Sequence, residues 1–154
     1  MRGAIHHVTD TPSSLDCAGR VLDLTQPCIM GVLNITPDSF SDGGAWLSVG
    51  DAIAHARQMV EAGADIIDVG GESTRPGAAP VSAEEELQRV IPVIEALQAG
   101  IDIPVSIETQ KPAVMRAAVS AGAGMINDVN ALQADDAVQT AARLGVPVCL
   151  MHMQ

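Results

Sequence analysis

Five apolar segments of this chain each end at polar side chains of types that bind ligands. These side chains are Asn34, Asp68 with Glu72-Ser73-Thr74-Arg75, Glu108, Asn127 with Asp128, and His152. Together they could form hydrogen bonds to a small polar ligand and balance its charge. One polar residue after a strand is commonly a turn or helix-cap residue, and that interpretation is adopted for Asp51 and Asp128. Helix capping and one shared ligand site both remain open as explanations of the repeated pattern.

Two kinds of hydrophobic pattern alternate along the segments that must position these residues. Short, β-branched runs predict strands at 28–33, 65–69, 104–107, 124–126 and 147–151. Helical spacing predicts helices at about 52–63, 82–97, 112–122 and 134–144. The second helix begins with the capping-box pair Ser82 and Glu85. Pro92 inside it is expected to kink or break the helix, unless the helix restarts there.

This alternation predicts a parallel sheet that is covered on both faces or closed as a barrel. In a (β/α)₈ barrel the active site lies at the carboxyl ends of the strands, where the polar residues fall. No GxGxxG or GxxxxGK[ST] motif is present, which disfavours nucleotide-binding folds. The predicted fold class is therefore α/β, a partial (β/α)₈ (TIM) barrel of about five parallel strands and four helices. A short hairpin, pairing Ala4–Val8 with Arg20–Leu24, is expected before it.

Composition limits the classes of partner. The 154 residues carry a net charge of −11 and a single lysine, Lys111, which argues against nucleic acid or an anionic membrane as partner. Neither an apolar run of about 18 residues nor a signal-peptide pattern is present, so we predict no membrane span and a cytoplasmic location. The three cysteines form no CxxC motif. Cys28 and Cys149 are interpreted as small core residues, and Lys111 as a helix-start residue.

Four segments carry a resemblance to a known family. They are Ile29–Gly44, Gly63–Gly77, Ile126–Asp128 and Cys149–Gln154. These segments resemble dihydropteroate synthase, of the pterin-binding family, and the similarity covers about residues 20–154. The resemblance implies the N-terminal portion of a (β/α)₈ barrel, with a hairpin or cap at 1–27 and the barrel part at 28–154, truncated after strand five.

The resemblance also implies roles for individual residues. Asn34 would bind Mg²⁺ and the pyrophosphate of the pterin substrate. Glu108 and Asn127 would hydrogen-bond the edge of the pterin ring. Thr74 and Arg75 would lie near the departing pyrophosphate.

Four further residues receive a role from the same resemblance. Phe40 and Pro76 would frame the ring of p-aminobenzoate, and Met151 would contact substrate. Asp38 would stabilise positive charge at the pterin methylene, although loop solvation explains Asp38 equally well.

The implied activity is a transferase reaction of folate biosynthesis. The arylamine of p-aminobenzoate displaces pyrophosphate from a pterin methyl diphosphate, and the intact parent would be a homodimer and a target of sulfonamides. Two departures stand out: Glu108 replaces the aspartate of the family pattern Asp-Thr-x-Lys-Pro, and the chain reaches only the fifth of eight strands. We therefore expect little activity from these residues alone. The alternatives are a non-catalytic remnant or interaction module, and a pterin-binding methyltransferase-type barrel.

Overall fold

The computed structural model describes residues 12–36 and 48–152. In this part of the chain, five parallel strands form one sheet in the order in which they occur in the sequence. They are β3 (Met30–Asn34), β4 (Ile66–Gly70), β5 (Val105–Glu108), β6 (Met125–Asp128) and β7 (Val148–Leu150). The helices between them are α1 (Val49–Glu61), α2 (Ala83–Gly100), α3 (Pro112–Ala121) and α4 (Ala137–Leu144). The predicted strands and helices are thus confirmed in type and order.

The ends of the strands differ slightly from the prediction. Asn34, Glu108 and Asp128 are the last residues of β3, β5 and β6 and do not follow these strands. Their backbones therefore belong to the hydrogen-bonded ladder, which holds the side chains more rigidly than a loop would.

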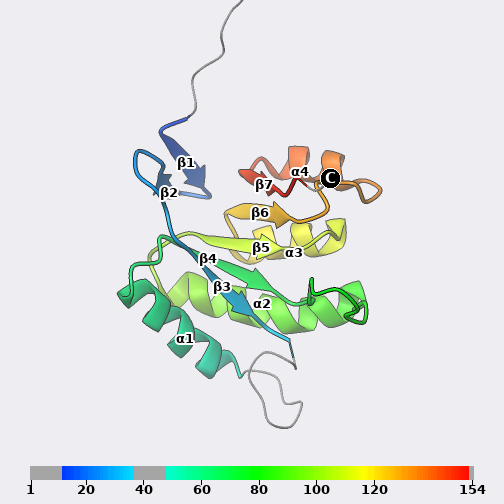
Figure 1. Cartoon of the computed structure of the whole chain (residues 1–154), viewed down its shortest axis with the longest axis horizontal. Helices are drawn as coiled ribbons and strands as arrows, with labels where there is room; N and C mark the ends of the chain where they lie inside the picture. The colour runs from blue at the N-terminus through cyan, green and yellow to red at the C-terminus, as the bar shows by residue number, and fades with distance from the viewer. Residues whose placement is uncertain (1–11, 37–47, 153–154) are drawn as a thin grey trace, which may run out of the picture.

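The main hydrophobic core lies between one face of the sheet and the helices (Figure 1). The sheet contributes alternate residues of each strand, and the helices contribute their apolar stripes. Buried members of this core include Leu33, Ile67, Val69, Ile107 and Ile126 from strands and Ala56, Val90, Ile94, Leu97, Val114 and Met115 from helices. Because side chains alternate across a strand, the intervening residues face the opposite side of the sheet.

That opposite side is closed at the amino ends of the strands by an antiparallel hairpin, β1 (Ser14–Cys17) and β2 (Arg20–Asp23). Cys17 and Leu22 of the hairpin are buried against Ile66 and Met125 of the sheet. Figure 1 shows the hairpin beside the starts of the strands, away from the arrowheads. The carboxyl ends of the strands are therefore at the end of the sheet that the hairpin does not cover.

The predicted hairpin exists, but the prediction of its first strand is wrong. Arg20–Asp23 pairs with Ser14–Cys17, because Ala18 and Gly19 both adopt positive φ and form a tight two-residue turn between them. The segment 4–8 lies outside the described residues. The turn sits close to the sheet: a Cβ added at Gly124 would lie 2.3 Å from the carbonyl oxygen of Cys17. Only glycine fits there without moving the hairpin.

The helix boundaries follow from local chemistry, with one exception. The side chain of Ser82 accepts a hydrogen bond from the backbone N–H of Glu85 and begins α2 as predicted, and Ser48, which was not predicted as a cap, accepts one from the backbone N–H of Asp51 and begins α1. The expected break at Pro92 is wrong, because α2 runs through it as one helix of 18 residues. Pro92 is exposed, so water can hydrate the backbone carbonyl that loses its helical donor.

The interpretation of Cys149 as a core residue is also wrong, and Cys28 is only half buried. All three residues of β7 are exposed, because β7 pairs with β6 and lies at the edge of the sheet as described. Among the described residues, no helix combines the length and hydropathy needed to cross a membrane.

Candidate functional site

Three side chains lie in one row at the carboxyl ends of four neighbouring strands. The register aligns Asn34 with Gly70, Gly70 with Glu108, and Glu108 with Asn127. Gly70 leaves a gap in this row: a Cβ there would lie 3.2 Å from Glu108 Oε2 and 3.4 Å from Asn34 Oδ1. The amide oxygen of Asn34 and the carboxylate of Glu108 therefore border the same small space.

Asp68 lies one layer below this row and supports it. The carboxylate is buried, with 1% of its surface exposed. Its Oδ1 accepts a hydrogen bond of 2.5 Å from Ser106 Oγ, and its Oδ2 accepts one of 3.0 Å from Asn127 Nδ2. Burial raises the pKa of Asp68, while these two hydrogen bonds oppose the rise. The bond to Asp68 also fixes the orientation of the Asn127 amide, so that its oxygen remains available to a ligand.

Glu108 is the residue of the row whose charge responds to pH near neutrality. Burial raises the pKa of its carboxyl from 4.5 to about 7, and the negative charges of Asp68 and Glu86 add to the rise. At neutral pH the group is therefore present both as an acid and as a carboxylate. It can donate or accept a hydrogen bond, according to what a ligand presents.

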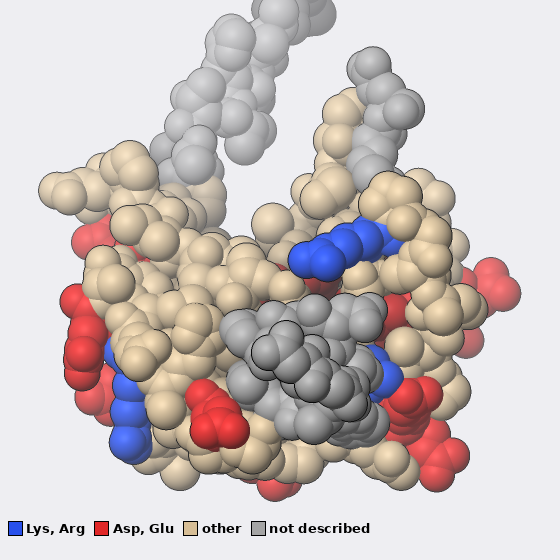
Figure 2. All heavy atoms as spheres, turned by 60° about the horizontal axis from the view of Figure 1, so that its bottom comes forward, with Lys and Arg blue, Asp and Glu red and all other residues tan. Residues whose placement is uncertain are grey.

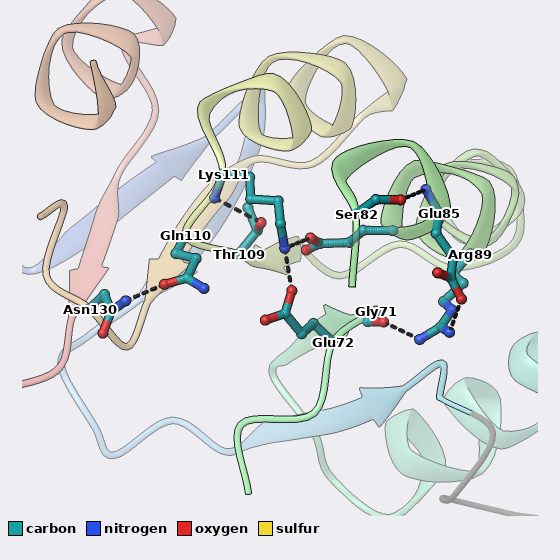
Figure 3. Close-up of polar contacts among 10 residues, drawn as sticks. Gly71, Glu72, Ser82, Glu85, Arg89, Thr109, Gln110, Lys111 and Asn130 are labelled. Atoms are coloured by element: carbon teal, nitrogen blue, oxygen red, sulfur yellow. Dashed lines mark hydrogen bonds and ion pairs between the residues drawn. The ribbon is translucent and has the colours of Figure 1, made fainter. Parts of the chain in front are cut away.

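Lys111 lies beside the row and connects two neighbouring elements. Its Nζ binds the carboxylate of Glu72, which follows β4, and donates a hydrogen bond of 2.7 Å to Glu86 Oε2 on α2 (Figure 3). Burial lowers the pKa of Lys111, but the hydrogen bonds and charges of Glu72 and Glu86 outweigh it, and the pKa lies above its ordinary value. The lysine is therefore a permanent cation at this site.

A second cation holds the same loop from the opposite side. Arg89 of α2 is 7% exposed and donates a hydrogen bond of 2.8 Å from Nη1 to the carbonyl of Gly71. Its Nη2 forms an ion pair of 2.5 Å with Glu85. Figure 3 shows Arg89 and Lys111 converging on the consecutive residues Gly71 and Glu72.

A cavity of about 320 Å³ opens at this end of the sheet. Its lining is shared by the loops after β4, β5 and β6, with Met151 on its wall beyond β7, and includes Glu72, Ser73, Thr74, Glu86, Glu108, Thr109, Gln110, Lys111, Val129, Asn130 and Met151. A volume of this size suits a ligand of one or two rings. On the face drawn in Figure 2, the blue cationic side chains are few and separated, and red carboxylates lie along both sides.

The structure brings together most of the residues predicted from sequence. Thr74, Glu108 and Met151 line the cavity, and Asn34 and Asn127 lie in the row with Glu108. Arg75 and Pro76 are exposed in the loop between β4 and α2. Asp38 and Phe40 fall outside the described residues, so their predicted roles stay predictions.

The turn interpretation of Asp128 is confirmed, whereas Asp51 is not the N-cap of α1, because Ser48 holds that position. Asp128 accepts hydrogen bonds from the backbone of Asn130 and Leu132 and thereby orders the turn after β6. Asp51 lies in the first turn of α1 and accepts a hydrogen bond of 2.7 Å from Ser48 Oγ.

Sequence reasoning missed Ser106, Glu86, Arg89 and the ion pairs of Lys111. For Ser106 a signal was available, because Val105-Ser106-Ile107-Glu108 alternates apolar and polar residues and so predicts two polar groups on one face. Glu86 and Arg89 lie within a helical pattern, where charged residues are usually interpreted as solvent-facing. Lys111 is at the start of α3, as predicted, but its side chain points away from a capping role.

The donor set of the site bears on whether a metal ion could be held here. Among the described residues, no group of three or more histidine, cysteine, aspartate or glutamate side chains is arranged to bind one. Asn34 Oδ1 and the carboxylate of Glu108 are the oxygen atoms that border the gap over Gly70.

Several curated proteins that are similar to this chain share one name. Dihydropteroate synthase of Escherichia coli K12 is 58% identical over 136 residues, which are 88% of this chain and 48% of that protein. Dihydropteroate synthase of Haemophilus influenzae is 52% identical over 135 residues, 88% of this chain and 49% of that protein. The chain therefore spans about half the length of these curated relatives.

Solved structures agree with these relatives. A dihydropteroate synthase from Xanthomonas albilineans with 4-aminobenzoic acid superposes with a TM-score of 0.87 and 60% identity, over 93% of this chain and 52% of that chain. The enzyme of the same organism in complex with 7,8-dihydropteroate gives a TM-score of 0.82 and 56% identity, over 92% of this chain and 51% of that chain. The prediction of a partial (β/α)₈ barrel is thereby confirmed. The family described as pterin binding enzyme matches residues 30–154, and the chain belongs to that family.

Proposed function

We propose that this chain supplies the pterin-binding part of a dihydropteroate synthase. The proposed reaction joins p-aminobenzoate to a (7,8-dihydropterin-6-yl)methyl diphosphate and releases pyrophosphate. The single observation that carries the proposal is the row of Asn34, Glu108 and Asn127, supported by Asp68, beside a cavity of about 320 Å³. The identity of 60% to a synthase structure with 4-aminobenzoic acid supports it. Homodimer formation and sulfonamide sensitivity remain predictions from the family resemblance, and cytoplasmic location remains a prediction from the sequence pattern.

The proposed pterin contacts follow from the hydrogen-bonding groups of the row. The edge of a pterin ring presents alternating N–H donors and nitrogen or oxygen acceptors. Glu108 can accept from a ring N–H as a carboxylate, and Asn127 offers its amide oxygen while its nitrogen is held by Asp68. Because Asp68 and Asn127 are positioned before a ligand arrives, little conformational entropy is lost on binding.

The proposed diphosphate subsite lies at the other end of the row. Asn34 would hold Mg²⁺ through its amide oxygen, and the bound ion would neutralise charge on the leaving pyrophosphate. Thr74 and Arg75, on the loop after β4, could hydrogen-bond the same phosphate oxygens, since a guanidinium group matches phosphate in a bidentate manner. With a net charge of −11, the protein needs such cations to bind an anionic substrate.

In the proposed chemistry, the arylamine nitrogen forms a bond to the pterin methylene as the C–O bond breaks. The bonding electron pair leaves with pyrophosphate, and the arylamine then loses a proton. The protein's part is to position both substrates and to stabilise the departing anion. Pro76 and Phe40 would frame the arylamine ring, Met151 would close the cavity wall, and Asp38 would stabilise positive charge at the methylene.

Calorimetric titration of the purified chain with pterin diphosphate tests the proposal. We expect saturable binding that strengthens with Mg²⁺ in the wild type. Asn34→Ala should lose the Mg²⁺ dependence, and Glu108→Leu should lose affinity with or without Mg²⁺. Gln139→Ala, at an exposed position of α4, is the matched control. Absence of pterin diphosphate binding by a folded chain would refute the proposal in favour of a non-catalytic remnant.

A turnover assay separates binding from catalysis. Release of pyrophosphate that depends on both p-aminobenzoate and pterin diphosphate would support synthase activity. The same assay without p-aminobenzoate measures background hydrolysis. If the chain binds a pterin with the same affinity whether or not the pterin carries a diphosphate, a methyltransferase-type barrel would be favoured instead.

A further inference from the structure

The loop between β4 and α2 carries Thr74 and Arg75, yet few hydrogen bonds hold it along its length. Within it, the N–H of Arg75 donates to Ser73 Oγ at 3.4 Å and the N–H of Ala78 donates to the carbonyl of Arg75 at 3.1 Å. Residues 74–80 are exposed. The loop is therefore held mainly at its two ends, by its first residues after β4 and by Ser82 at the start of α2.

Those first residues are fixed tightly. At Gly71, a Cβ would lie 2.8 Å from Val90 and 3.1 Å from the side chain of Glu86, so the backbone lies directly on α2. Arg89 binds the carbonyl of Gly71, and Lys111 binds the carboxylate of Glu72. The loop thus leaves the sheet between one cation from α2 and one from the start of α3.

Lys111, at the start of α3, connects the loop after β4 to α2. Its Nζ lies between Glu72 and Glu86, whose carboxylates would otherwise repel each other. Glu86 is 1% exposed, and its Oε1 has no hydrogen-bond partner among the described residues, so Lys111 is its charge partner there. Removing the ammonium group would leave two uncompensated carboxylates side by side, and only Glu72, at the loop, is free to move away.

We propose that Lys111 is a positioning residue: by holding Glu72 against Glu86 it fixes the start of the β4–α2 loop, and with it the location of Thr74 and Arg75 beside the cavity. The mechanical part of this proposal stands on the ion pairs alone. Its consequence for substrate rests on the proposed function. The neighbouring residue Gln110 binds Asn130 of the next loop, so the β5–α3 turn contacts the loops on both sides of it (Figure 3).

Amide hydrogen exchange of residues 72–81 in the full 154-residue chain tests the mechanical part. Lys111→Met keeps the aliphatic stem but removes the charge, and it should speed exchange in this loop about tenfold, as loss of a charge-assisted hydrogen bond implies. Lys111→Arg should restore slow exchange. Arg116→Met removes an exposed cation of α3 whose hydrogen bond of 3.2 Å goes to Thr140 of α4 and not to the β4–α2 loop, and it is the matched control.

If Lys111→Met does not fold, the variant Glu72→Gln can still test the proposal. This variant leaves the buried pair of Lys111 and Glu86 intact, so the chain should remain folded while the loop is released. The loop amides of the double variant Glu72→Gln/Lys111→Met should exchange no faster than those of Lys111→Met alone. The reason is that the two substitutions remove the same ion pair. Loop exchange that is unchanged in Glu72→Gln, or that changes equally in Arg116→Met, would overturn the proposal.

Binding of pterin diphosphate with Mg²⁺ tests the consequence for substrate. Lys111→Met should weaken this binding about tenfold, and Lys111→Arg should recover most of it. Faster loop exchange with unchanged affinity would overturn the positioning role, although the ion pairs would stand. Absence of binding in the wild type would refute the proposed function, and the exchange result would still decide whether Lys111 holds the loop.

Discussion

Replacing Glu108 with glutamine should remove a pH-dependent loss of stability. The carboxyl of Glu108 has a pKa of about 7 in the folded chain, compared with an ordinary value of 4.5. Between these values the folded state binds the proton more tightly than the unfolded state does. Stability therefore falls as pH rises from about 4.5 to about 7, and the loss is complete above the folded pKa.

The magnitude follows from the difference between the two pKa values. A difference of about 2.5 pH units, at 1.36 kcal/mol per unit, sets a ceiling of about 3.4 kcal/mol. Glu108 borders an open cavity and is half buried, so water screens part of this cost. We expect roughly 1.5 kcal/mol to remain. Glu108→Gln should then match the wild type near pH 5 and exceed it by roughly that amount at pH 8.

Urea unfolding followed by far-UV circular dichroism, at pH 5, 6, 7 and 8, measures this difference. The difference between variant and wild type isolates Glu108, because the other titratable groups are common to both proteins. Glu95→Gln, an exposed carboxylate of α2, controls for the loss of one negative charge. A difference between Glu108→Gln and wild type that is constant across this pH range would refute the reasoning.

Three further substitutions test the elements that support the site. Gly124→Ala should cost about 1–3 kcal/mol of stability by forcing the hairpin away from the sheet; faster exchange of amides in 14–23 reports the displacement, and unchanged exchange would contradict it. Ser106→Ala removes the hydrogen bond of 2.5 Å that the serine hydroxyl donates to the buried carboxylate of Asp68. It should lower the free energy of unfolding, measured in urea, by about 1–3 kcal/mol. Ser82→Ala removes the N-cap of α2 and should lower the free energy of unfolding by about 1 kcal/mol. An equal loss in the control Ser120→Ala would show that the effect does not come from the lost cap.

The sequence was sufficient for those features that depend on local patterns. Strand and helix positions followed from hydrophobic spacing, and the ends of α1 and α3 followed from Gly63 and Gly122, which both adopt positive φ. The polar end of each strand predicted which residues meet at one end of the sheet, since parallel strands bring their carboxyl ends together. Asn34, Glu108 and Asn127 are in one row for this reason.

Features that depend on distant parts of the chain could not be predicted in this way. The partners of Lys111 lie 39 and 25 residues before it, so no local pattern connects them. Pro92 is tolerated because it lies on the exposed side of α2. The rule that proline kinks or breaks a helix does not take this exposure into account. Cys149 looked like a core residue because a strand's hydrophobicity does not reveal whether the strand is central or at an edge.

The order of the strands bears on how the chain folds during synthesis. Each strand of the sheet pairs with the strand that precedes it in the sequence, so no described strand must wait for a later one to be placed beside it. The sheet can therefore extend by one strand–helix unit at a time as the ribosome releases the chain, with short sequence separations at every step. Lys111 joins the growing structure after both of its partners, Glu72 and Glu86, have been made. The loop beside the cavity would then become fixed only when the residue that precedes α3 has reached its place against Glu72 and Glu86.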